Sequence, residues 1–111
     1  GLDEISPYAK TNVIQLKDGE TSEIIIDPKE LNIGANKFDD LIGDNAEFNA
    51  NEIIKIFKGE DNDFSKAVCL NAAAGIIVAE QNSKFKDAYE SARSHILSGQ
   101  TFENLKKIQN V

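Results

Sequence analysis

The first pattern along the chain is a pair of segments rich in β-branched residues, separated by a polar turn. Residues 11–16 (TNVIQL) and residues 22–27 (SEIIID) both favour β-strands. Residues 18–19, Asp-Gly, lie between them and are a strong signal for a tight hairpin turn. Residues 24–26 are three consecutive isoleucines, which indicates burial on both faces or an inner position in a larger sheet. We therefore expect an antiparallel hairpin with further partner strands.

Downstream of the hairpin the apolar residues recur at helical spacing. Asp27-Pro28 opens a short turn over residues 28–32, because Asp is a good N-cap and Pro is favoured at the first helical position. Residues 38–42 form a second short helical piece that ends at Gly43. These pieces connect the predicted hairpin to longer helices.

The longer helices have recognisable starts and stops. Asp44 begins one helix, with Glu47 three residues later in the manner of a capping box, and Gly59 fits the residue after its C-cap. A second helix begins near residues 61–63, and its segment 67–79 is apolar all round. A helix of that kind is expected to be buried on most sides.

Two more helices complete the predicted order. Asn82 or Ser83 caps the first of them, which ends at Gly99. A last short helix is capped by Thr101. The apolar residues of the two helices, expected to face inward, are Phe85, Ala88, Tyr89, Ala92 and Ile96 in the first and Phe102, Leu105 and Ile108 in the second.

Three polar side chains in these helices are candidates for chemistry. Asn71 interrupts the apolar run 67–79, and a buried amide needs hydrogen-bond partners, so we expect it to tie the helix to a loop backbone rather than to bind a ligand. Cys69 is expected to be a small core residue, since a catalytic thiol needs a nearby base and His95 lies on a different predicted helix. His95 itself is expected at the surface, near the negative end of its helix.

Composition and charge narrow the class of protein. The chain has 111 residues, enough for one domain, and a net charge of −7. An acidic chain repels phosphate backbones and lacks the basic cluster that anionic membranes attract, so we expect neither nucleic-acid nor membrane binding. The sequence shows no signal peptide and no bilayer-spanning stretch, and its single Cys fits a reducing cytoplasm. Because it has no Met and opens on polar residues, we interpret it as a fragment of a longer protein.

Two adjacent carboxylates, Asp3 and Glu4, are the candidate metal ligands. Anionic oxygens are the ligands that Mg²⁺ prefers, and Mg²⁺ usually sits between one or two protein carboxylates and a substrate phosphate. Neighbouring residues of a regular strand point to opposite faces, so the pair must act from a turn at a strand end, and Pro7 keeps the segment out of a helix interior. The alternative is a solvated acidic terminus.

Read together, five stretches of the chain resemble the C-terminal part of anthranilate phosphoribosyltransferases. They occur in the family's order and at about its spacing, and they cover nearly the whole chain. Glu80 departs from the pattern, because a Gly often ends that helix in the family. The stretches are residues 1–6 (GLDEIS), residues 17–20 (KDGE), Gly43-Asp44 with Asn49-Ala50 and Gly59, residues 67–74 (AVCLNAAA), and Ala92-Arg93 with Ile96, Ser98-Gly99 and Leu105.

The resemblance implies a fold and a reaction. The fold is α/β: residues 1–111 would be the C-terminal portion of a larger α/β domain, a β-hairpin followed by about four packed α-helices. The enzymes transfer the phosphoribosyl group of phosphoribosyl pyrophosphate to the amine of anthranilate and release pyrophosphate, a step of tryptophan biosynthesis. Asp3 and Glu4 match the family's acidic pair, which holds a Mg²⁺ that contacts pyrophosphate. No catalytic or substrate-binding residue is assigned to this chain.

The resemblance also implies what lies outside the chain. The family's Gly-rich pyrophosphate loop, its Lys-His-Gly-Asn segment and the Arg that grips anthranilate all belong upstream. So does the N-terminal helical domain that forms the usual homodimer contact. We therefore expect the 111-residue chain alone to be inactive.

Three other functions remain open at this point. A pyrimidine nucleoside phosphorylase has a similar fold, but it uses phosphate as nucleophile and needs no acidic pair for pyrophosphate-bound Mg²⁺. A non-catalytic relative that binds nucleic acid is disfavoured by the negative charge of this chain. The third alternative is an autonomous helical interaction module with a hairpin.

Overall fold

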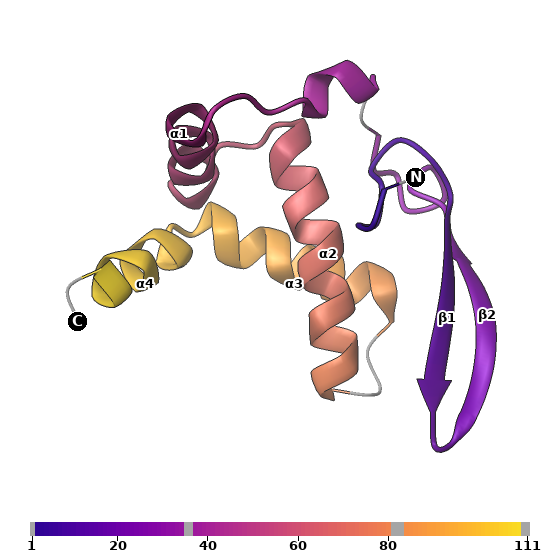
Figure 1. The fold of residues 1–111 in the computed structure, drawn as a ribbon. Helices are drawn as coiled ribbons and strands as arrows, with labels where there is room; N and C mark the ends of the chain where they lie inside the picture. Colours follow the sequence, from indigo (N-terminus) through magenta and orange to yellow (C-terminus); the bar gives the residue numbers. More distant parts are fainter. Residues whose placement is uncertain (1, 35–36, 81–83, 110–111) are drawn as a thin grey trace.

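The computed structural model describes residues 2–34, 37–80 and 84–109 of the chain. Within these ranges a two-stranded antiparallel hairpin is followed by a 3₁₀ turn and four α-helices (Figure 1), which confirms the predicted order. The elements are β1 (Thr11–Lys17), β2 (Glu20–Ile26), η1 (Phe38–Leu41), α1 (Ala46–Phe57), α2 (Asp63–Glu80), α3 (Phe85–Leu97) and α4 (Gln100–Gln109).

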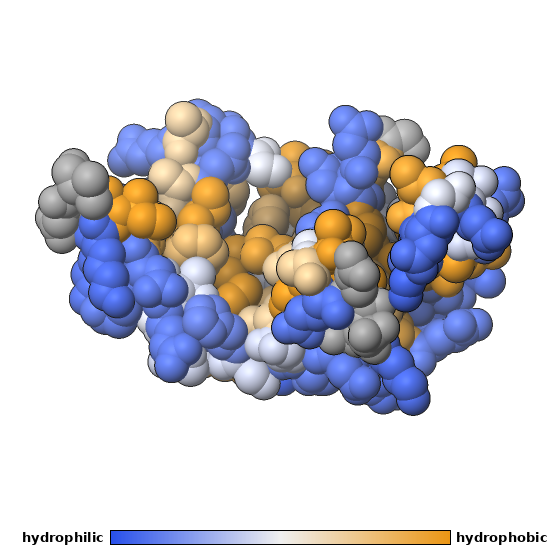
Figure 2. Space-filling view, turned by 90° about the horizontal axis from the view of Figure 1, so that it is seen from below, coloured by the Kyte–Doolittle hydropathy of each residue, from blue (hydrophilic) through white to orange (hydrophobic). Residues whose placement is uncertain are grey.

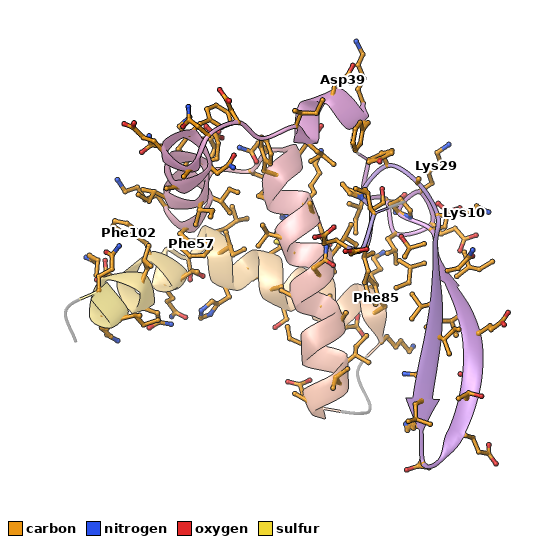
Figure 3. All side chains as sticks on the ribbon, in the orientation of Figure 1. Lys10, Lys29, Asp39, Phe57, Phe85 and Phe102 are labelled. Atoms are coloured by element: carbon orange, nitrogen blue, oxygen red, sulfur yellow. The ribbon has the colours of Figure 1, made fainter. Side chains whose placement is uncertain are left out.

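The hairpin and the helices α1 and α4 occupy opposite sides of α2. In Figure 1 the hairpin stands to one side of α2, α3 crosses behind it, and α1 and α4 lie on the other side. Phe85, at the start of α3, points toward the hairpin in Figure 3, whereas Phe57 and Phe102 lie together at the far side of the molecule, on α1 and α4. The hairpin and α4 therefore lie at opposite sides of the molecule.

The hairpin turn forms as the sequence predicts. Asp18 and Gly19 both have positive φ, 53° and 82°, and they connect Lys17 directly to its partner Glu20. Two consecutive residues with positive φ give a turn whose twist matches that of the strands, and Gly adopts this conformation without a steric penalty.

The expected burial of residues 24–26 on both faces of the hairpin is wrong for the described chain. Ile26 is buried, but Ile24 and Ile25 are 41% and 63% exposed. Ile25 lies on the outer face of the hairpin, which no layer of the described residues covers. Ile24 shares the inner face with Ile26, where it lines the hollow between the hairpin and α2. Ile14 and Leu16 share this outer face with Ile25 and are exposed for the same reason, and their cross-strand partners there are polar: Asn12, Thr21 and Glu23.

Helix α1 begins one residue later than the sequence predicts. Its N-cap is Asn45, whose side-chain oxygen accepts the N–H of Phe48 at 3.0 Å, so the expected capping box of Asp44 and Glu47 does not form. Asp44 is instead held by Asn49, whose Oδ1 accepts the Asp44 N–H and whose Nδ2 donates to the Asp44 carbonyl, each at 3.0 Å. The hydrogen bonds of Asn49 thus hold the backbone of Asp44 outside the helix, where Asp44 does not act as the N-cap.

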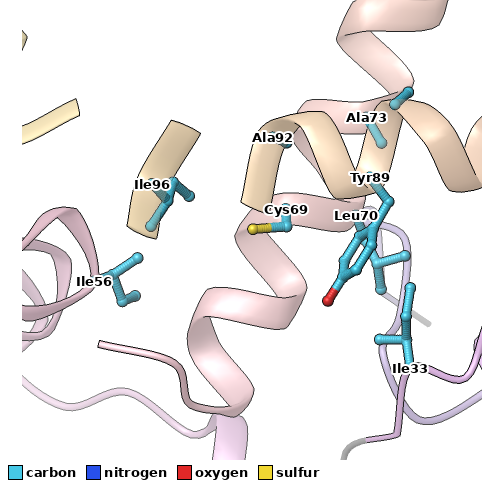
Figure 4. Close-up of a cluster of buried hydrophobic side chains, with 9 residues drawn as sticks. Ile33, Ile56, Cys69, Leu70, Ala73, Tyr89, Ala92 and Ile96 are labelled. Atoms are coloured by element: carbon cyan, nitrogen blue, oxygen red, sulfur yellow. The ribbon is translucent and has the colours of Figure 1, made fainter. Parts of the chain in front are cut away.

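The core lies between α2 and α3. Cys69, Leu70 and Ala73 of α2 face Tyr89, Ala92 and Ile96 of α3, and Ile33 and Ile56 close the two ends (Figure 4). The apolar stripe predicted for α3 is therefore confirmed. The expected burial of α2 on most sides is wrong, because Val68 is 37% exposed and Val78 is 79% exposed.

The start of α4 also differs from its prediction. Thr101 lies inside the first turn of a helix that begins at Gln100, so it is not the N-cap, and Ile108 is 71% exposed rather than inward. Phe102 instead anchors this helix, with the ammonium groups of Lys58 and Lys106 4.9 and 5.3 Å from its ring centroid. The predicted caps of α3, Asn82 and Ser83, lie outside the described residues.

Candidate functional site

The acidic pair, Asp3 and Glu4, lies exposed on a bend that precedes the hairpin. The sequence led us to expect a turn at a strand end, but residues 5–10 separate the pair from the start of β1. Neither carboxylate has an ion-pair or hydrogen-bond partner among the described residues. The carboxylate oxygens are therefore open to a ligand from outside the chain.

The residues that follow the acidic pair are fixed in place. The backbone N–H of Ser6 donates to Thr11 Oγ1 at 3.1 Å, and Ser6 Oγ accepts the N–H groups of Tyr8 and Ala9 at 3.3 and 3.2 Å. Ser6 and Pro7 are buried, and Ile5 packs against the core. The carboxylates thus project from an anchored loop.

Asn71 connects this loop to α2. Its Oδ1 accepts the N–H of Ile5 at 2.9 Å, and its Nδ2 donates to the Ile5 carbonyl at 3.1 Å and to the Ala67 carbonyl at 2.9 Å. The prediction that this amide ties the helix to a loop backbone is confirmed. Sequence reasoning did not identify which loop, because nothing in the local pattern links two residues 66 positions apart.

The chemistry of the two side chains fits a Mg²⁺ ion that is shared with a phosphate. Two carboxylates supply hard oxygen ligands and leave most of an octahedral shell to water or to phosphate oxygens. In the described part of the chain, no group of three or more His, Cys, Asp or Glu side chains is placed to hold a metal ion. Two carboxylates would leave the rest of the coordination shell of an ion to ligands from outside the described residues.

Cys69 is excluded as a nucleophile by its surroundings. It is 1% exposed, and burial raises the pKa of its thiol to about 11, so the thiol is protonated at neutral pH. His95 is exposed in the last turn of α3, as predicted. The prediction that Cys69 is a core residue is confirmed.

A polar hollow beside the core contains an ion pair that sequence reasoning missed. It is lined by Leu31, Asn32, Lys66, Tyr89, Glu90 and Arg93, and Arg93 forms an ion pair there with Asp61. That carboxylate is the main cause of a raised pKa at the Arg93 guanidinium. Arg93 belongs to one of the family-like stretches, but its partner is 32 residues away and no spacing rule points to it.

A second hollow is apolar and lies between the hairpin and α2. It is lined by Ile5, Val13, Ile26, Ala74, Ile77 and Phe85, among others. Figure 2 shows hydrophobic side chains gathered in the middle of the face seen from below, between hydrophilic margins. No helix of the described residues is both long and apolar enough to cross a membrane.

Comparisons with known proteins match nearly the whole chain. The family model described as glycosyl transferase family, a/b domain, matches residues 1–102. The chain is 71% identical over all 111 residues to an anthranilate phosphoribosyltransferase of Pelagibacter ubique, and it covers 34% of that protein. It is 37% identical over 108 residues to the enzyme of the same name from Methanococcoides burtonii, and this match covers 97% of the chain and 31% of that enzyme.

A solved structure supports the fold. A variant of anthranilate phosphoribosyltransferase from Saccharomyces cerevisiae with Mg bound matches with a TM-score of 0.78 at 21% sequence identity. The match covers 96% of this chain and 31% of that structure. The chain therefore spans about a third of the length of the proteins that it resembles.

Proposed function

Because this chain belongs to the glycosyl transferase family, a/b domain, we propose that it is the part of an anthranilate phosphoribosyltransferase that carries the metal-binding carboxylates. The observation that supports this proposal is the 71% identity over the whole chain to a protein of that name. The exposed acidic pair on an anchored loop is consistent with it. The rest of the enzyme, about two thirds of its length, would supply the other substrate contacts.

The proposed reaction breaks one bond to the ribose and forms another. The C1–O bond of phosphoribosyl pyrophosphate breaks, pyrophosphate leaves with the bonding electrons, and the amine of anthranilate forms a C1–N bond and then loses a proton. The leaving group is a polyanion, so negative charge accumulates on it as the bond breaks. A bound Mg²⁺ would supply charge neutralisation at the pyrophosphate.

Asp3 and Glu4 have a binding role in this proposal. Their side chains would hold the metal while their anchored backbone fixes where it lies relative to the substrate. The net charge of −7 on these residues disfavours direct binding of pyrophosphate, so a contact on this side of the site would use a bridging cation or a helix N-terminus, and we propose the cation. Cys69 takes no part in the reaction, because its thiol is buried and protonated.

We also propose the cellular setting that this activity requires. The enzyme would act in the cytoplasm, in tryptophan biosynthesis, and would form a homodimer through a helical domain outside these 111 residues. Phosphoribosyl pyrophosphate and anthranilate are its proposed substrates, and Mg²⁺ is its proposed cofactor.

The test uses a full-length protein that carries this sequence. Consumption of anthranilate is followed by the loss of its fluorescence, with phosphoribosyl pyrophosphate and a range of Mg²⁺ concentrations. The double variant Asp3→Asn with Glu4→Gln is expected to lower kcat/KM at least about 100-fold, because a bound metal contributes several kcal/mol to charge stabilisation. A matched variant, Asp18→Asn with Glu20→Gln at the exposed hairpin turn, changes the same two side-chain types and should retain activity.

Two results would contradict this proposal. Unchanged activity of the Asp3→Asn, Glu4→Gln variant would show that the metal assignment is wrong. Absence of anthranilate consumption together with cleavage of thymidine by phosphate would assign the protein to the pyrimidine nucleoside phosphorylases instead.

A further inference from the structure

We propose that Asn71 is a positioning residue for the acidic pair, an inference that rests on the metal-binding role proposed above. Its side chain bonds both backbone polar groups of Ile5, the residue that directly follows Glu4. Asn71 would act on the metal through the backbone of Ile5, without touching the ion. We call these two hydrogen bonds the Asn71–Ile5 clamp.

The clamp fixes two consecutive peptide planes. The N–H of Ile5 belongs to the peptide that joins Glu4 to Ile5, and the carbonyl of Ile5 belongs to the peptide that joins Ile5 to Ser6. One rigid amide group bonds both, at 2.9 and 3.1 Å. Because each peptide is planar, the orientation of Glu4 relative to α2 is limited to rotation about a few remaining bonds.

The amide of Asn71 is itself held in one orientation. Its Nδ2 also donates to the Ala67 carbonyl, one helical turn earlier, at 2.9 Å. A flipped amide would place an NH₂ group against the N–H of Ile5 and an oxygen against two carbonyls. The third hydrogen bond therefore fixes the amide relative to α2, and the amide in turn fixes the backbone of Ile5 relative to α2.

The geometry of the neighbouring residues shows why a clamp is needed at this point. Ser6 and Pro7 are buried, Ser6 is also hydrogen-bonded, and the side chain of Ile5 packs on the core, but Asp3 and Glu4 are exposed. Among the described hydrogen bonds, those of the Asn71–Ile5 clamp lie nearest in sequence to the two carboxylates. A metal ligand needs such support, because loss of the groups that orient ligands typically weakens metal binding by 10- to 100-fold.

The experiment compares metal affinity among variants of a full-length protein that carries this sequence. Binding of Mn²⁺ at a fixed concentration of inorganic pyrophosphate is measured from the change that added protein causes in the electron paramagnetic resonance signal of the ion. The Mg²⁺ concentration for half-maximal velocity is measured separately. Asn71→Ala removes the clamp and is expected to weaken Mn²⁺ binding by about 10-fold or more. The same variant should raise the required Mg²⁺ concentration by a similar factor.

A control separates positioning from general stability of α2. Ser65 lies in the first turn of the same helix, where it is 3% exposed and its Oγ accepts the N–H of Asn62 at 3.0 Å. Ser65→Ala should lower the melting temperature without changing Mn²⁺ affinity.

A second variant, Asn71→Asp, is used if the alanine variant does not fold. It keeps the acceptor for the Ile5 N–H but loses the donor to the Ile5 carbonyl. It is expected to bind Mn²⁺ more weakly than the wild type.

The possible failures can be told apart. If the Asp3→Asn, Glu4→Gln variant loses Mn²⁺ binding but the Asn71 variants bind as Ser65→Ala does, the positioning role is refuted and the proposed function stands. If the Asp3→Asn, Glu4→Gln variant binds Mn²⁺ like the wild type, the proposed metal site is refuted. The proposed positioning role of Asn71 is then refuted as well.

Discussion

At the scale of single residues, Cys69 and Tyr89 lie in the core between α2 and α3, 1% and 4% exposed. Burial raises the pKa of the Cys69 thiol to about 11 and the pKa of the Tyr89 hydroxyl to about 12. In the unfolded chain the same groups titrate near 9 and 10. The pKa of each group is therefore raised in the folded state and returns to its ordinary value when the chain unfolds.

These shifts give a stability that depends on alkaline pH. Above pH 9 the unfolded chain loses protons that the folded chain keeps, so the free energy of unfolding should fall as pH rises from about 9 to 11. Cys69→Ala and Tyr89→Phe should each reduce this fall by roughly 1–3 kcal/mol at pH 11, because each pKa unit corresponds to about 1.4 kcal/mol. Denaturant midpoints of a full-length protein at pH 8 and pH 11 provide the measurement. An equal fall in the free energy of unfolding for wild type and variants would contradict the raised pKa values of Cys69 and Tyr89.

Thr101 has a buried hydroxyl without a partner among the described residues. A buried polar group that makes no hydrogen bond costs about 1–3 kcal/mol, and Thr and Val have similar helix propensities. Thr101→Val should therefore raise the free energy of unfolding by about 1 kcal/mol, measured by chemical denaturation. Thr101→Ser keeps the hydroxyl and should bring no gain. A less stable valine variant would mean that the hydroxyl is bonded in the complete protein.

At the scale of elements, the connection between α1 and α2 depends on how α1 ends. The N–H of Gly59 bonds the Ile56 carbonyl at 2.8 Å and the N–H of Glu60 bonds the Lys55 carbonyl at 3.1 Å, which is the hydrogen-bond pattern of a Schellman motif. Gly59 has a φ of 100°, and a Cβ there would lie 3.3 Å from the Leu97 carbonyl oxygen at the end of α3. This glycine thus serves both the turn and a close approach between helices.

Gly59→Ala should be destabilising for both reasons. A side chain at positive φ costs roughly 1–2 kcal/mol, and crowding against Leu97 adds to this. We expect a loss of at least about 1 kcal/mol, seen as a lower denaturant midpoint. Gly19→Ala is a useful comparison, because Gly19 also has positive φ but has open space around its Cβ position. A smaller effect at Gly59 than at Gly19 would contradict the role of the close approach.

Local signals predicted the elements but not the contacts between distant residues. The Asp18-Gly19 turn, Gly59 and the stripe of α3 are read correctly because each depends on neighbours within a few positions. Asp44 failed as a cap because Asn49 holds it in another arrangement. For the site, the pair of carboxylates is visible in the sequence, whereas the link between Asn71 and Ile5 requires the fold.

At the scale of the whole molecule, the hairpin exposes three large apolar side chains on its outer face. Ile14, Leu16 and Ile25 are 75%, 71% and 63% exposed, and the chain spans about a third of the length of its relatives. In a full-length protein, further segments would be available to pack on this face. The expectations of a larger α/β domain and of an inactive 111-residue chain remain predictions.

The outer face of the hairpin predicts opposite effects of one variant in two settings. In the 111-residue chain, Ile14→Lys with Leu16→Lys should reduce self-association and binding of a hydrophobic dye, since it removes exposed apolar surface. In a full-length protein, the same change should lower the melting temperature, because it would bury two charges. Light scattering and thermal unfolding provide the two measurements. An unchanged melting temperature in the full-length protein would show that this face stays open to solvent.

The Asn71–Ile5 clamp joins residues that are 66 positions apart in the chain, and this separation has a consequence for the order of folding. Closing so long a loop costs conformational entropy before the contact contributes any stability, whereas α2 and α3 are close in sequence and meet at a lower cost. The loop that carries the acidic pair should therefore take its final position after the helical core has assembled. Mg²⁺ would then bind the finished protein and not its precursors, and would stabilise the native state by mass action. Pulsed hydrogen exchange during refolding would reveal this, because protection of the Ile5 amide should appear after protection of the α2 core.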